Sequence, residues 1–137
     1  MKIVQQLYSR FDHLPPFISS VLDQLKREVP LSEDETFNIR LALEESLTNA
    51  VKHGNKFNPA LMVNVEVEYK NGRLTMTVKD QGAGFDFDHV PDPTLEERRM
   101  LTCGRGICLM RKIMDKVEFS NGGRRIQMVK SLSSNAF

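Results

Sequence analysis

The order of hydrophobic and polar positions predicts two amphipathic helices in the first half of the chain. Apolar residues recur at helical spacing over about residues 17–25. A second helical pattern covers about residues 32–53 and ends at Gly54. Ser32 followed three residues later by Glu35 is the signature of a capping box, so the second helix has a defined start.

Alternation of apolar and polar residues, which is typical of half-buried strands, appears in the remaining segments. The strands that it predicts are about residues 2–9, 63–69, 74–78, 116–120 and 124–132. Asn71-Gly72 is a strong hairpin turn between the second and third of them. A third helix is expected over 104–114, whereas residues 83–103 lose all periodicity and indicate a long loop.

These elements, in the order β-α-α-β-β-loop-α-β-β, predict an α+β fold. We expect a two-layer α/β sandwich, in which helices cover one face of a mixed, mostly antiparallel sheet. The 137 residues fit a single domain, and we assign residues 1–137 to it.

Composition narrows the function classes. Nineteen basic and eighteen acidic residues give a net charge of +1. The chain therefore has no large positive electrostatic field that would attract nucleic acid. No apolar run approaches the length needed to cross a membrane, and the N-terminus has no signal-peptide pattern. We therefore expect a cytoplasmic protein. Cys103 and Cys108 match no common zinc spacing, and we expect both thiols to be reduced.

The second helix carries the first candidate chemistry. Glu45 and Asn49 stand four residues apart and so project from one helix face. A carboxylate can take a proton from an attacking hydroxyl, and an amide oxygen can bind a hard cation such as Mg²⁺. Taken alone, the pair is more typical of an exposed polar helix surface than of a reactive site.

Two glycine-containing segments add further candidates. Asp80 directly follows a strand, and Gly82 and Gly84 would let the backbone approach a ligand closely. A carboxylate there can accept a hydrogen bond from the amine of adenine. The alternative for this segment is an ordinary turn.

The second glycine segment precedes the third helix. Gly104-Arg105-Gly106 offers main-chain N–H groups, a helix dipole and a cation to phosphate oxygens. A plain helix start after a loop is the alternative here. The three segments together, in this order, are the parts of an ATP site.

In combination these residues resemble the ATPase fold shared by DNA gyrase, the heat-shock chaperones, sensor histidine kinases and the mismatch-repair protein MutL. Within that group, the small size is similar to the serine-kinase anti-sigma factors of bacteria. The resemblance covers about residues 3–131 and implies ATP and Mg²⁺ as cofactors. It also implies a homodimer that binds a sigma factor and phosphorylates a serine of an anti-sigma-factor antagonist.

The resemblance assigns roles to the first two segments. It implies that Glu45 is the general base and that Asn49 is the magnesium ligand. Asp80 matches the adenine-binding aspartate, and Gly82 and Gly84 match the turn beneath the base.

The resemblance extends to the last third of the chain. Gly104 and Gly106 match the phosphate-facing glycines, with Arg105 between them, and about residues 86–103 match a mobile lid over ATP. The last hairpin departs from the family pattern. Relatives commonly carry Gly-Thr there, whereas this chain has Gly123 followed by Arg124.

The leading hypothesis is thus a protein serine/threonine kinase that acts as a partner-switching anti-sigma factor. The alternative is a non-catalytic module in which nucleotide only sets a conformation that a partner reads. A stand-alone histidine-kinase catalytic domain is a third hypothesis. It would need a phosphorylatable histidine on another protein, because the chain has no helical hairpin that bears one.

Overall fold

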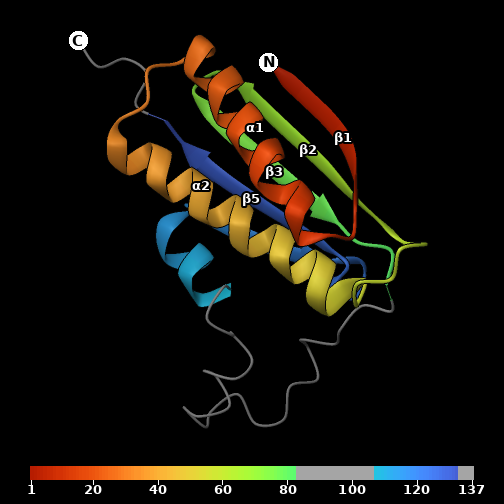
Figure 1. The fold of residues 1–137 in the computed structure, drawn as a ribbon. Helices are drawn as coiled ribbons and strands as arrows, with labels where there is room; N and C mark the ends of the chain where they lie inside the picture. The colour runs from red at the N-terminus through yellow and green to blue at the C-terminus, as the bar shows by residue number, and fades with distance from the viewer. Residues whose placement is uncertain (83–106, 133–137) are drawn as a thin grey trace, which may run out of the picture.

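A computed structural model of the protein describes residues 1–82 and 107–132, and it has two layers (Figure 1). One layer is a five-stranded sheet with the order β1-β2-β3-β5-β4. Its strands are β1 (Lys2–Tyr8), β2 (Met62–Lys70), β3 (Arg73–Lys79), β4 (Lys116–Ser120) and β5 (Arg125–Ser131). The predicted α+β class and the five predicted strands are confirmed.

The second layer contains α1 (Leu14–Glu28), α2 (Glu33–Thr48) and a helix at 107–113. These helices lie on one face of the sheet, with α2 between the other two (Figure 1). The core fills the space between the layers, because the apolar stripe of each helix meets the inward face of the strands. Ile39, Leu43 and Leu47 of α2 are completely buried, as their helical spacing predicts.

All four strand pairings are antiparallel. The expectation of a mostly antiparallel sheet is therefore met, but the described strands contain no parallel pair that would make the sheet mixed. Asn71 and Gly72 have φ values of 53° and 77° and join β2 to β3 as the tight turn that their sequence predicts.

The predicted long helix is two helical segments joined end to end. The capping box at its start is present: the Ser32 Oγ accepts from the Glu35 N–H and the Glu35 Oε1 accepts from the Ser32 N–H, both at 3.0 Å. After Thr48 the chain continues without a break into the π-helical segment η2 (Asn49–Gly54). Such wider turns inside helices often lie at functional sites.

Two further expectations concern membrane-spanning segments and the state of the cysteines. In the part of the chain that the structure describes, no helix has the length and apolar character needed to span a bilayer. The expectation of a reduced Cys108 is wrong, because its sulfur is disulfide-bonded. Cys103 lies outside the described residues.

Candidate functional site

The candidate site begins at the junction of α2 and η2. Glu45 and Asn49 lie one helical turn apart, and both side chains are half-buried. The Asn49 N–H donates to the carbonyl oxygens of Glu45 and Ser46, so the helix holds the two residues in a fixed relation. Both lie beside the buried stripe, where a partly covered carboxylate and an amide oxygen remain accessible.

Asp80 lies at the end of β3, and its carboxyl group is partly buried. Burial raises the pKa of Asp80 above its ordinary value, although a main-chain N–H and the positive charge of Arg124 act in the opposite direction. The N–H is that of Gly82, which donates to Asp80 Oδ1 at 3.0 Å. The Asp80 carboxyl group is thus a partly desolvated hydrogen-bond acceptor at the end of β3.

The Asp80 segment packs directly on the end of the helix that carries Glu45 and Asn49. A Cβ built on Gly54 would overlap the Asp80 carboxyl group, and one built on Gly82 would overlap the Gly54 carbonyl. A larger residue at Gly54 would displace the Asp80 carboxyl group, and one at Gly82 would collide with main-chain atoms. The Asp80–Gly82 segment thus meets the end of the helical segment that begins at Asn49.

A buried asparagine that was not predicted from the sequence stabilises the contact between η2 and the segment after β3. Asn55 is 1% exposed, and its Oδ1 accepts from the Gln81 N–H at 2.8 Å. Its Nδ2 donates to Ser9 Oγ at 2.9 Å and to the Met62 carbonyl at 3.0 Å. The side chain thereby ties the segment after β3 to the ends of β1 and β2. A polar residue directly after a helix-ending glycine was the only signal in the sequence.

Several predicted site residues lie outside the described part of the chain. They are Gly84, Gly104, Arg105, Gly106 and the predicted lid at about 86–103. Their roles stay predictions.

The described residues contain no cluster of three or more His, Cys, Asp or Glu side chains suited to a metal ion. The predicted magnesium site therefore rests on the Asn49 amide. A single protein oxygen suits Mg²⁺ that is bound mainly through water and phosphate oxygens.

Comparison with known proteins agrees with this geometry. Residues 7–130 match the histidine kinase-like ATPase domain. This chain belongs to that family. The match covers the helix of Glu45, the Asp80 turn and the final hairpin, so the segments that meet in the structure are those of a known ATPase domain.

Relatives of this chain include proteins named as an anti-sigma factor and as serine-protein kinases. An anti-sigma F factor of Bacillus cytotoxicus is 30% identical over 107 residues, which cover 74% of this chain and 73% of the relative. Serine-protein kinases RsbW of Bacillus velezensis and Bacillus subtilis are 32% and 31% identical over 109 residues. These cover 73% of this chain and 67% of each relative.

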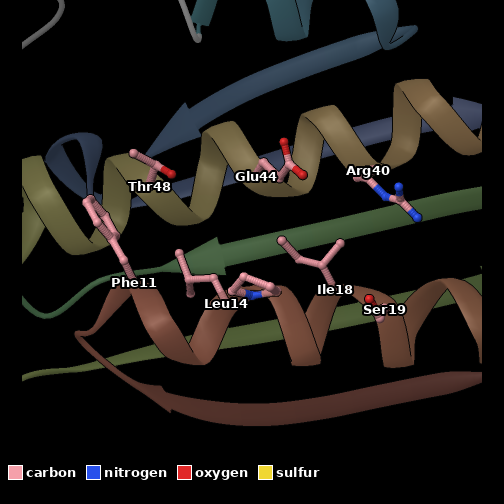
Figure 2. Close-up of a pocket in the computed structure, with 8 residues that line it drawn as sticks. Phe11, Leu14, Ile18, Ser19, Arg40, Glu44 and Thr48 are labelled. Atoms are coloured by element: carbon pink, nitrogen blue, oxygen red, sulfur yellow. The ribbon is translucent and has the colours of Figure 1, made fainter.

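A groove of about 400 Å³ lies between α1 and α2 of the ATPase domain (Figure 2). Leu14 and Ile18 line it from α1, while Arg40, Glu44 and Thr48 face it from α2. The groove and the Glu45–Asn49 pair occupy different flanks of α2, because successive residues of a helix are about 100° apart. The groove is therefore a second surface beside the candidate site.

The groove ends at an exposed aromatic pair. The rings of Phe11 and Phe57 pack edge to face with centroids 5.0 Å apart, and each side chain is nearly half exposed. Phe57 and the preceding Lys56 have φ values of 58° and 51°, which are unusual for residues other than glycine. Such strain is common where a protein holds a binding surface in place.

Replacement of Gly82 by alanine is expected to disrupt the junction. The new methyl group would collide with the Gly54 carbonyl, which is main chain and cannot rotate away. We expect a loss of about 1–3 kcal/mol in the free energy of unfolding, the usual cost of overpacking, and weaker ATP binding.

Urea unfolding and calorimetry with Mg-ATP measure these two effects. Gly72→Ala is the control, because it also adds a methyl group to a glycine and lies at the far β2–β3 turn, where the φ of 77° makes the substitution unfavourable. That control should lower stability and leave ATP affinity unchanged. Unchanged ATP affinity in Gly82→Ala would contradict the close packing of the two segments.

Proposed function

We propose that this protein is an ATP-dependent protein serine/threonine kinase that acts as an anti-sigma regulatory factor. Its substrate would be a serine on an anti-sigma-factor antagonist, and a sigma factor would be its second partner. One observation carries the proposal: the Asp80–Gly82 turn packs on the end of the helix that presents Glu45 and Asn49.

Each residue of this junction has a role in the proposed reaction. Mg-ATP, when bound, supplies the phosphoryl group that is transferred. Asp80 accepts a hydrogen bond from the adenine amine, and the Asn49 amide oxygen is a ligand for the cation. Glu45 orients the hydroxyl group of the acceptor serine and takes its proton. The protein thus contributes mainly positioning and charge stabilisation.

The relatives support the choice of partners. Proteins named anti-sigma F factor and serine-protein kinase RsbW match about three quarters of this chain. A kinase and an anti-sigma factor are compatible in one protein, since nucleotide state and partner binding can be coupled through one conformational equilibrium.

The direct test has two stages. Calorimetry with Mg-ATP measures nucleotide binding, and a radiolabelled transfer assay then screens candidate antagonist domains from the same genome. Transfer to a serine supports the kinase. Stoichiometric binding of such a domain without transfer would instead support the non-catalytic module, and failure to bind ATP would refute both.

We further propose that the acceptor protein docks in the α1–α2 groove. Arg40 and Glu44 both face the groove, and no ion pair joins them in the described part of the chain. The order Arg then Glu is the less favourable one for pairing along a helix, so both charges remain available to a partner. A protein that docks in the groove and extends over α2 reaches Glu45 over about 10 Å, which is one helix diameter.

Reversal of the charge at Arg40 tests this docking. We expect Arg40→Glu to lower kcat/KM for the protein acceptor by at least about tenfold, because like charges placed opposite each other across an interface cost several kcal/mol. The affinity for ATP should stay the same, since Arg40 is on the groove flank of α2. Arg27→Glu, an exposed charge reversal near the end of α1, serves as the control. Equal kcat/KM in both variants would place docking elsewhere.

A further inference from the structure

Three successive main-chain N–H groups follow the end of β3, and each donates to a different acceptor. The Asp80 N–H donates to the Arg124 carbonyl at 2.8 Å, which continues the β3–β5 pairing by one residue. The Gln81 N–H donates to Asn55 Oδ1 at 2.8 Å. The Gly82 N–H donates to Asp80 Oδ1 at 3.0 Å. The Asn55 side chain therefore holds the middle of the turn.

The main chain at Gln81 sets the orientation of the Asp80 carboxyl group. An aspartate side chain that accepts from the N–H two residues later forms an Asx turn, which depends on the path of the chain between them. The bond from the Gln81 N–H to Asn55 fixes that path, and so places the next N–H against Asp80 Oδ1. Asn55 is 1% exposed, so it acts on the carboxyl group through the main chain rather than by contact with a ligand.

The Asn55 amide is itself fixed at all of its polar atoms. Its Nδ2 donates to Ser9 Oγ at 2.9 Å and to the Met62 carbonyl at 3.0 Å. Ser9 Oγ donates in turn to the Leu61 carbonyl at 2.7 Å. Both amide hydrogens thus have acceptors and the amide oxygen has a donor. Rigid support of this kind keeps a binding group within about 0.5 Å of its productive position.

We propose that Asn55 is a positioning residue for recognition of the adenine amine, and that it acts by orienting the Asp80 carboxyl group. The inference rests on the proposed function, in that the adenine amine binds at Asp80. A hydrogen bond weakens steeply as its angle departs from linear. Rotation of the carboxyl group would therefore lose the contact with the amine, while the contacts to the rest of the nucleotide remain.

Calorimetry on the whole chain with two magnesium nucleotides tests the proposal. One is ATP, and the other is purine riboside triphosphate, which has the ring of adenine but lacks the exocyclic amine. In the natural protein, we expect ATP to bind about 10- to 100-fold more tightly than the analogue, which leaves the carboxylate without its donor. Asn55→Ala should weaken ATP binding by about tenfold and leave binding of the analogue nearly unchanged, so the ratio of the two dissociation constants moves toward one.

Ser9→Ala is the matched control. Ser9 is 2% exposed, and the substitution removes the oxygen that accepts from Asn55 Nδ2. It leaves the bond from the Gln81 N–H to Asn55 Oδ1 in place. We expect a lower free energy of unfolding in both alanine variants, but a changed nucleotide ratio only in Asn55→Ala. A role confined to folding would lower stability in both variants and leave both ratios as they are in the natural protein.

A second variant repeats the test with less disturbance of the buried site. Asn55→Ser leaves a smaller cavity than Asn55→Ala and keeps a polar group beside Ser9. Its oxygen lies one bond nearer the main chain, so it falls short of the Gln81 N–H. The nucleotide ratio of Asn55→Ser should therefore also move toward one.

The outcomes separate this inference from the proposed function. Unchanged ratios in Asn55→Ala and Asn55→Ser would overturn the inference and leave the kinase intact. An equal change of ratio in Ser9→Ala would do the same, because the effect would then follow general destabilisation. Failure of the natural protein to bind ATP would overturn the proposed function, and the inference with it. Equal binding of ATP and the analogue by the natural protein would remove the amine from Asp80 and overturn both.

Discussion

Replacement of Glu45 by glutamine is expected to remove phosphoryl transfer while Mg-ATP binding persists. Glutamine has nearly the same shape as glutamate but cannot take the proton of the acceptor hydroxyl. General-base catalysis typically contributes about 10²–10⁴-fold, so kcat should fall within that range. Single-turnover transfer of labelled phosphate to the acceptor protein measures the loss, and calorimetry measures the dissociation constant of Mg-ATP.

The adjacent carboxylate is a matched control for this experiment. Glu44 is exposed and faces the α1–α2 groove, so Glu44→Gln should keep kcat at saturating acceptor. Any effect of Glu44→Gln belongs in the KM for the acceptor, because that residue lies on the proposed docking surface. If the two glutamine variants transferred phosphate at the same rate, Glu45 would not be the base.

Replacement of Asp80 by asparagine is expected to weaken ATP binding by about 10- to 100-fold. The change replaces a charged acceptor by a neutral one, and hydrogen bonds to charged groups are worth about 1.5–3 kcal/mol. Calorimetry with Mg-ATP at neutral pH measures the effect. Asp23→Asn on the exposed side of α1 is the control and should bind ATP normally.

The same substitution should not destabilise the nucleotide-free protein. Because burial raises the pKa of Asp80 in the folded state, the protonated form favours folding. That contribution is fully present below the ordinary aspartate pKa of 3.8 and is lost as pH rises through the higher folded-state pKa. Asparagine stays neutral at every pH, so Asp80→Asn should equal or exceed the natural protein in stability at pH 7.

Urea unfolding at pH 7 and at about pH 3 tests this sign. The difference in the free energy of unfolding between Asp80→Asn and the natural protein should be more favourable to the variant at pH 7 than at pH 3. Weak ATP binding together with undiminished stability would separate loss of a ligand contact from misfolding. The opposite result is that Asp80→Asn loses stability relative to the natural protein when the pH rises from about 3 to 7. That result would contradict a buried acceptor at this position.

The secondary structure was largely predictable because its signals are local. The capping box of Ser32 and Glu35 and the Asn71-Gly72 turn depend on residues within one turn of each other, and both occur as predicted. The apolar stripe of α2 is equally local, since helical spacing alone places Leu43 and Leu47 on one face. The change to a π-helical turn at Asn49–Gly54 was not predictable, because it depends on the packing around the end of α2.

By itself, the sequence determined the class of the fold, the helix that carries Glu45 and Asn49, and the aspartate–glycine turn that resembles an ATP site. Tertiary structure alone decided that Gly54 and Gly82 meet, that the Asn55 side chain is buried between three segments, and that Arg124 lies opposite Asp80. The physical reason is the range of the interactions. Periodicity and capping act between neighbours in the chain, whereas close backbone contact, desolvation and cross-strand pairing join residues that are tens of positions apart.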